Sequence, residues 1–102
     1  MTKILAIRYR TKPECADENA RLIEGVFAEL AERQAQGIRY TALRLDDEVS
    51  FLHVVALDGE DNPLDASPAF AAFQTGIGER VEEGPFPSGA TVVGSYGGAI
   101  GA

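Results

Sequence analysis

The chain is poor in the residues from which covalent and metal sites are usually built. Its 102 residues include one cysteine, Cys15, and one histidine, His53. A single cysteine excludes an internal disulfide, and one histidine with one cysteine cannot form a zinc site. The acidic segment Asp58–Asp65 lacks the ligand spacing of a calcium loop. We therefore expect no metal.

Basic residues are also scarce, with 9 against 16 acidic ones and a net charge of −7. This charge repels phosphate backbones and anionic lipid surfaces, so we expect no nucleic-acid partner and no membrane partner. No apolar stretch approaches the ~20 residues of a membrane span. Met1-Thr2-Lys3 runs directly into a predicted strand, without the apolar segment of a signal peptide. The expected location is the cytoplasm.

Motifs for common cofactors and nucleophiles are missing too. Gly94, Gly97 and Gly98 follow no strand-to-helix transition, so they form no dinucleotide fingerprint. The Gly-x-Ser-x-Gly motif of serine hydrolases is absent. The sequence therefore offers neither a dinucleotide-binding loop nor the serine motif of a hydrolase.

Two predicted strands are almost unbroken apolar runs, Ile4–Ile7 and Phe51–Leu57. Successive side chains of a strand point to opposite faces, so a half-buried strand should alternate. Runs without alternation predict a sheet that is buried on both faces. The chain offers two helices, enough for one face. We therefore expect a homodimer in which a second copy covers the other face.

The first strand is predicted at Lys3–Arg10. Thr11, three residues before Glu14, fits a capping box that opens a helix running to about Gln36. Its apolar residues recur at helical spacing, and Gly37 is expected to cap its C-terminus.

Two strands at 38–45 and 49–57 flank the polar turn Asp46-Asp47-Glu48, which predicts an antiparallel hairpin. Ser67-Pro68 opens the second helix, whose buried stripe is Phe70, Phe73, Ile77 and Val81. Gly76 and Gly78 indicate space for a ligand, close helix–sheet packing or an early end of this helix. Residues 82–89 are expected to be a loop, 90–96 the fourth strand and 97–102 a flexible tail.

The order βαββαβ predicts one α+β domain over residues 1–102. The fold class is ferredoxin-like, an antiparallel sheet with two helices on one face, and two copies would pair into a dimeric α+β barrel.

Three segments resemble a known family: the strand Ile4–Tyr9, the hairpin Tyr40–Leu57 with its Asp46-Asp47 turn, and Ser67–Phe73 at the start of the second helix. They are similar to the dimeric α+β barrel superfamily, in particular its antibiotic-biosynthesis-monooxygenase-like domains. The resemblance implies a homodimer whose sheets face each other across a closed barrel. It also implies several activities, among them cofactor-independent oxidation of aromatic polyketides, haem degradation and isomerisation. The haem-degrading and anthrone-oxidising relatives use a tryptophan, which this chain lacks.

His53 is the strongest candidate for chemistry because it lies inside the most apolar strand. Burial favours its neutral form, which can act as a general base for an oxygenase or isomerase. The alternative is a packed histidine bonded to a carbonyl, a tyrosine or a dimer partner.

Tyr40 lies directly opposite His53 if the hairpin loop is Asp46 and Asp47 alone. If the loop takes three residues, Thr41 faces His53 instead. Arg44, on the same side as Tyr40, either binds an anionic substrate or pairs with an acid of the turn.

The sequence thus predicts a cofactor-independent monooxygenase or isomerase for a small aromatic or polyketide-like molecule. His53 and Tyr40 are its predicted catalytic pair, and Arg44, Phe27, Phe70 and Phe73 its predicted substrate-binding residues. The alternative is a non-catalytic dimeric module that binds a small hydrophobic ligand. An open cleft reaching His53 favours the enzyme, and a fully bonded His53 in a closed core favours the module.

Overall fold

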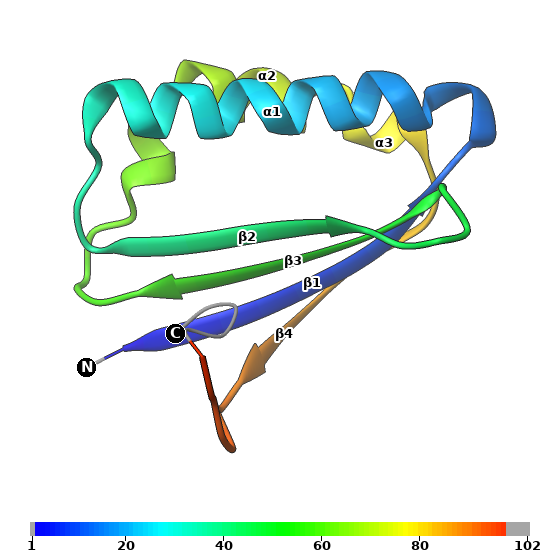
Figure 1. Ribbon diagram of the computed structural model, residues 1–102. Helices are drawn as coiled ribbons and strands as arrows, with labels where there is room; N and C mark the ends of the chain where they lie inside the picture. The colour runs from blue at the N-terminus through cyan, green and yellow to red at the C-terminus, as the bar shows by residue number, and fades with distance from the viewer. Residues whose placement is uncertain (1, 98–102) are drawn as a thin grey trace.

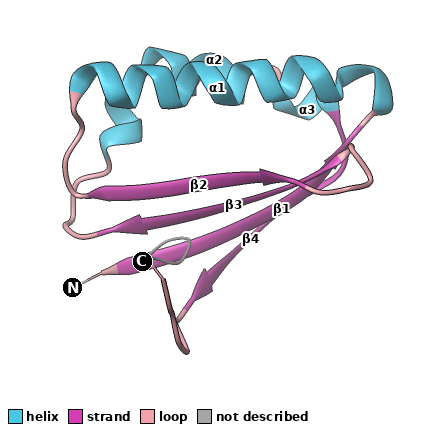
Figure 2. Cartoon of the chain, viewed as in Figure 1, coloured by secondary structure: helices cyan, strands magenta, loops and turns pink. Residues whose placement is uncertain are grey.

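The computed structural model describes residues 2–97 and confirms the ferredoxin-like fold. Four strands form one antiparallel sheet in the order β2-β3-β1-β4, and the helices lie over one face of it (Figures 1 and 2). The elements, in chain order, are β1 (Lys3–Thr11), η1 (Pro13–Cys15), α1 (Ala16–Arg33), β2 (Ile38–Arg44), β3 (Ser50–Leu57), η2 (Pro63–Ala66), α2 (Pro68–Thr75), α3 (Ile77–Arg80) and β4 (Val81–Ala90).

The helix face of the sheet carries the core. Tyr9 lies opposite Phe51, and Ile7 lies opposite His53, so the two central strands present these side chains to the helices together. Residues two apart share a face of a strand, and the helix face is therefore built from alternate positions of β1, β2 and β3. Its members are Leu5, Ile7, Tyr9, Ile38, Tyr40, Ala42, Phe51, His53, Val55 and Leu57.

The opposite face, which we call the open face, carries the other alternate positions. Its apolar members are Ile4, Ala6, Leu43, Leu52, Val54, Ala56 and Phe86. Most of them are only half-buried, and Phe86 is 50% exposed. No helix among residues 2–97 covers this face (Figure 1). The central strands lack alternating polar residues because both faces of the sheet carry apolar side chains. A homodimer that covers the open face stays a prediction.

The start of the first helix differs from the prediction. Thr11 belongs to β1, and its Oγ1 donates to Val49 O (3.3 Å) instead of capping a helix. The 3-10 turn Pro13–Cys15 precedes α1, which has no side-chain N-cap. At the other end Gln34 takes the left-handed conformation (φ 51°) expected of Gly37, because its N–H can then bond back to the last turn.

The fourth strand was predicted at the wrong place. It spans Val81–Ala90, where two prolines and two glycines indicated a loop, whereas residues 91–96 form no regular element. Proline is tolerated because β4 lies at the sheet edge, where an N–H is not needed for a second ladder. Gly84 is required there: it adopts φ 91°, and a Cβ would lie 3.0 Å from Arg8 O. Most of the predicted flexible tail, residues 98–102, lies outside the described residues.

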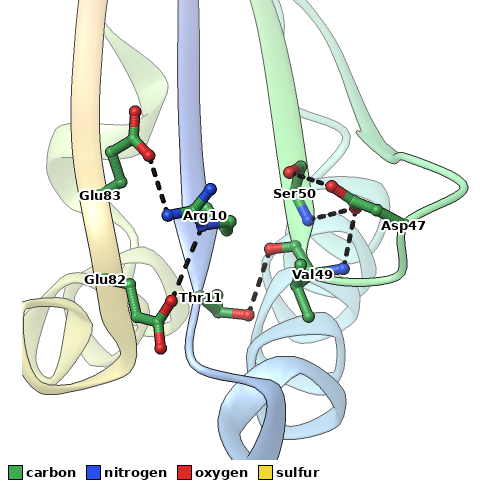
Figure 3. A network of polar contacts seen from close by, with 7 residues as sticks. All are labelled: Arg10, Thr11, Asp47, Val49, Ser50, Glu82 and Glu83. Carbon is green, nitrogen blue, oxygen red and sulfur yellow. Dashed lines mark hydrogen bonds and ion pairs between the residues drawn. The ribbon is translucent and has the colours of Figure 1, made fainter.

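Exposed polar contacts fix the end of the sheet beside Tyr9 (Figure 3). Arg10 pairs with Glu83 (3.1 Å) and with Glu82 (3.7 Å) across β1 and β4. In the hairpin, one Asp47 oxygen accepts the N–H groups of Val49 and Ser50. Exposed pairs of this kind add at most about 1 kcal/mol each to the free energy of unfolding.

The second helix begins as predicted and ends earlier. The Ser67 hydroxyl accepts the Phe70 N–H (2.9 Å), an N-cap for α2. Gly76 separates α2 from the short α3, and Val81 starts β4 instead of continuing the helical stripe. A Cβ at Gly76 would lie 2.9 Å from Arg80 Nη1, so this glycine makes room for a buried arginine.

Candidate functional site

A cavity of about 430 Å³ lies between the helix face and the helices α2 and α3. Its volume falls in the range of small-molecule sites, roughly 300–1,000 Å³. The walls are mostly apolar, with a few polar groups contributed by the strands, a loop and α2. The lining residues are Leu5, Ile7, Tyr9, Tyr40, His53, Val55, Asn62, Leu64, Phe70, Phe73, Gln74, Ile77, Pro85 and Pro87.

His53 lies at the centre of β3 and is 4% exposed. Both ring nitrogens are hydrogen-bonded: Nε2 to Tyr9 Oη (2.8 Å) and Nδ1 to Tyr40 Oη (2.6 Å). Burial lowers the pKa of His53 from 6.5 to about 4, because the charged ring would lose its hydration. The imidazole is therefore neutral near pH 7, and neither nitrogen is free to contact a ligand directly.

Tyr40 reaches His53 by a route that neither predicted register gives. Ala42 lies opposite His53, and Tyr40 lies opposite Val55, because the Leu45 N–H bonds to Ser50 O and the four residues 46–49 form the turn. The tyrosine therefore contacts the histidine diagonally across the strands, which its length allows. Burial raises the pKa of Tyr40 above its ordinary value and that of Tyr9 to about 12, so both hydroxyls stay protonated.

A chain of buried hydrogen bonds extends from the Tyr40–His53 pair through Tyr9 and Asn19 to Arg80. The sequence did not identify these last three residues as part of the site. Tyr9 Oη accepts from Asn19 Nδ2 (2.8 Å), and Asn19 Oδ1 accepts from Arg80 Nε (3.1 Å). One signal was present: Asn19 is the polar member of an apolar helical stripe that includes Ala16 and Ile23. Arg80 gave no such signal, since an arginine near a helix end is ordinarily exposed.

Arg80 is a buried cation held by neutral groups. It is 5% exposed, donates to Asn19 Oδ1 and to Phe73 O (2.6 Å), and lies over the Phe73 ring at 5.3 Å. No carboxylate among residues 2–97 pairs with it. A buried charge needs such bonds to offset its lost hydration. Asn19 Oδ1 and Phe73 O are therefore held as acceptors facing Arg80.

The predicted substrate-binding residues separate into two groups. Phe70 and Phe73 line the cavity, next to His53 and Tyr40. Phe27 does not line it and packs instead against the Tyr40 ring, with ring centroids 4.7 Å apart. Arg44 lies elsewhere, bonded to Asp17 of α1 (3.1 Å) and to Glu48 O (2.8 Å). Arg44 does not line the cavity, so a role in orienting a substrate beside His53 does not fit this position, and its acidic partner is Asp17 instead of an acid of the turn.

The described residues contain no group of three or more potential metal ligands. Between Thr2 and Gly97, no helix is both long and apolar enough to cross a membrane.

Comparison with protein-family models gives no match, and comparison with curated proteins gives none either. Solved structures do match. Rv0793 from Mycobacterium tuberculosis has a TM-score of 0.75 at 13% identity, over 95% of this chain and 100% of that one. An antibiotic biosynthesis monooxygenase has a TM-score of 0.66 at 19% identity, over 92% of this chain and 100% of its own. A mutant form of SnoaB, a cofactor-independent oxygenase from Streptomyces nogalater, has a TM-score of 0.66 at 17% identity, over 92% and 95% of the two chains.

The chain therefore has the fold of the antibiotic-biosynthesis-monooxygenase-like proteins, as its sequence segments predicted. Identities of this size establish the fold and leave the reaction to be argued from the site.

Proposed function

We propose that this protein is a cofactor-independent monooxygenase for a small aromatic or polyketide-like ketone. One observation supports this most: an apolar cavity of about 430 Å³ has the hydrogen-bonded pair Tyr40–His53 in its wall. The similarity to SnoaB, a cofactor-independent oxygenase with this fold, adds support. Isomerisation through an enolate is the alternative reaction at the same groups.

The reaction needs a substrate that supplies its own electrons. A methylene group activated by a neighbouring carbonyl loses a proton to solvent to give an enolate, the enolate carbon then bonds to one oxygen atom of O₂, and the peroxide takes a proton back from solvent. Loss of water from the resulting hydroperoxide leaves a new carbonyl, so CH₂ and O₂ give C=O and H₂O. Hydrogen bonding to the enolate oxygen lowers the cost of the first step. Phe70 and Phe73 hold the aromatic body of the substrate.

We further propose that the protein acts as a homodimer in the cytoplasm, paired through the open face. Supporting this is the run of Ile4, Ala6, Leu52 and Val54 on that face, which a monomer would leave in contact with water. A twofold axis through the face would bring identical patches together. The cavity lies on the opposite side of the sheet, so each copy would keep its own site.

A second candidate is the non-catalytic ligand-binding module, favoured by the bonding of both His53 ring nitrogens. Such a protein would bind the same ketones without converting them. The two candidates therefore differ in turnover and agree in binding.

Oxygen uptake with anthrone separates them. Anthrone, C₁₄H₁₀O, carries a carbonyl and an activated methylene, and uptake of one O₂ gives anthraquinone, C₁₄H₈O₂, and water. We expect the protein to accelerate uptake above the uncatalysed rate and ¹⁸O₂ to label the new carbonyl. Binding of anthrone with no acceleration would support the module and contradict the oxygenase.

A matched pair of variants locates the activity. Tyr40→Phe removes the hydroxyl in the cavity wall, and Tyr96→Phe makes the same change at a tyrosine that is 97% exposed. We expect kcat to fall at least tenfold in Tyr40→Phe and to be unchanged in Tyr96→Phe. Equal activity in the two variants would contradict a site at Tyr40.

A further inference from the structure

Each hydrogen bond in the buried series Arg80–Asn19–Tyr9–His53–Tyr40 has a donor and an acceptor. The order of donors and acceptors determines whether Tyr40 can donate a hydrogen bond to a molecule in the cavity. We propose that Arg80 orients every proton along this series, so that Tyr40 presents a hydrogen-bond donor to the cavity and selects ligands that carry an acceptor oxygen there. The inference rests on the proposed function only for the location of the site.

The order of donors and acceptors begins at Arg80, because a guanidinium donates hydrogen bonds and accepts none. Its Nε lies 3.1 Å from the Asn19 side-chain oxygen. A flipped Asn19 amide would place its NH₂ group against Nε–H, donor against donor. Asn19 must therefore turn its oxygen to Arg80 and its NH₂ to Tyr9, at 2.8 Å.

Within this chain of bonds, one arrangement gives the Tyr9 proton an acceptor. Its oxygen accepts from Asn19, so its own proton is directed to His53 Nε2 at 2.8 Å. That nitrogen must be bare, and in a neutral imidazole the proton is consequently on Nδ1. A doubly protonated ring would set a second donor against Tyr9, whose proton would then have no acceptor in this chain.

The last step reaches the cavity. Nδ1–H donates to Tyr40 Oη at 2.6 Å, so the Tyr40 oxygen is occupied as an acceptor. The Tyr40 proton cannot point back at His53 and turns instead to the cavity that Tyr40 lines. The ligand class that fits is a flat apolar molecule with a carbonyl or an oxyanion beside Tyr40. In this state His53 supports Tyr40 as a positioning residue.

The tautomer of His53 tests the first half directly, and the chain contains only this histidine. With ¹⁵N-histidine, the two-bond ¹H–¹⁵N spectrum near pH 7 should show a protonated Nδ1 and a bare Nε2. A protonated Nε2 in the native protein would overturn the proposal, whether or not the protein has oxygenase activity.

Asn19→Asp reverses the chain with almost no change of shape. A carboxylate accepts from both Arg80 and Tyr9, so the Tyr9 proton leaves His53 and the tautomer should change to Nε2–H. Gln36→Glu, the same amide-to-carboxylate replacement at an exposed residue outside the cavity, should leave Nδ1–H in place. Retention of Nδ1–H in a folded Asn19→Asp would contradict the assigned direction. Should Asn19→Asp not fold, the native tautomer still decides.

Binding of 1-tetralone and of tetralin tests the second half, since the two share a skeleton and differ in the carbonyl. We expect 1-tetralone to bind several-fold tighter, its C=O stretch to move to lower frequency, and both effects to disappear in Tyr40→Phe and shrink in Asn19→Asp. Equal affinity for the two probes, or a C=O stretch that is identical in native protein and Tyr40→Phe, would refute acceptor selection by Tyr40. Absence of anthrone turnover would refute the oxygenase alone.

Discussion

The two faces of the sheet come from the same strands and are opposite in character. On the helix face, Tyr9, Tyr40 and His53 are held in a chain of hydrogen bonds that ends at a buried arginine. On the open face, the apolar positions are aliphatic side chains without such bonds, among them Leu52 and Val54, and they lie beside Arg8, Arg39 and Thr41. Successive residues of a strand point to opposite faces, so side chains one position apart belong to different faces.

The difference between the two faces follows from what burial requires of polar side chains. A polar side chain enclosed by helices must find a partner, and each partner restricts the next, so the helix face becomes rigid and directional. Aliphatic side chains on the open face impose no direction and can pack against any complementary apolar surface. The helix face thus suits ligand recognition, and the open face suits association.

The largest effect is expected from breaking the helix face at Arg80. Arg80→Met keeps most of the volume but leaves Asn19 Oδ1 and Phe73 O without a donor, so the free energy of unfolding should fall by about 4 kcal/mol. Arg10→Met, which breaks only exposed pairs, should cost less than about 1 kcal/mol. Urea unfolding of both variants checks the contrast, and equal losses would contradict it.

Acid should weaken the helix face next. His53 has a pKa of about 4 when folded, below the roughly 6.5 of an unfolded chain. The unfolded chain therefore binds a proton first as pH falls. His53 contributes its full stability above about pH 6.5 and loses about 3 kcal/mol of it by pH 4.

His53→Phe removes this titration, and its difference from the native protein cancels the carboxylates that also titrate. We expect the stability difference between the two proteins to narrow from pH 7 to pH 4.5 in urea unfolding. A difference that stays constant over this range would mean that His53 is not held neutral by burial.

A charge on the open face should prevent association and leave the fold intact. Val54→Glu places a carboxylate among Ile4, Ala6 and Leu52, where a second copy would have to dehydrate it. We expect dimer affinity to fall at least a hundredfold, or about 2.7 kcal/mol. Sedimentation equilibrium measures this, and Thr41→Ser, on the same face, is the control that should stay dimeric. An unchanged molecular mass for Val54→Glu would contradict pairing through this face.

The smallest effect concerns the helix that closes the cavity. Ser67→Ala removes the N-cap of α2 and should cost about 1 kcal/mol of stability. Ser88→Ala, at an exposed strand position, should stay within about 0.5 kcal/mol of the native value. Thermal unfolding compares the two, and an equal shift would show that the Ser67 cap adds no stability.

The sequence predicted the fold because local signals agreed with one another. Apolar runs, the Ser67-Pro68 helix start and the hairpin turn all favoured the same βαββαβ order. The fourth strand failed because its prolines are acceptable only at a sheet edge, and which strand forms the edge depends on long-range pairing. The hairpin register failed for a related reason, since turn composition does not fix loop length.

The site was predicted in part. A histidine in an apolar strand identified the centre, and Phe70 and Phe73 followed from the helical stripe. Tyr9, Asn19 and Arg80 were missed because their bonds join positions as far apart as 61 residues. Arg44 was misplaced since side chains on one face of a twisted sheet need not converge on one point.

Native mass spectrometry of the freshly purified protein is the sharpest test of the division between the two faces. The native protein should have the mass of two chains, and each chain should offer one small-molecule site. Val54→Glu should have the mass of one chain, and Tyr40→Phe should have the mass of two. A single-chain mass for the native protein would contradict this division, because the open face would then be stable without a second copy.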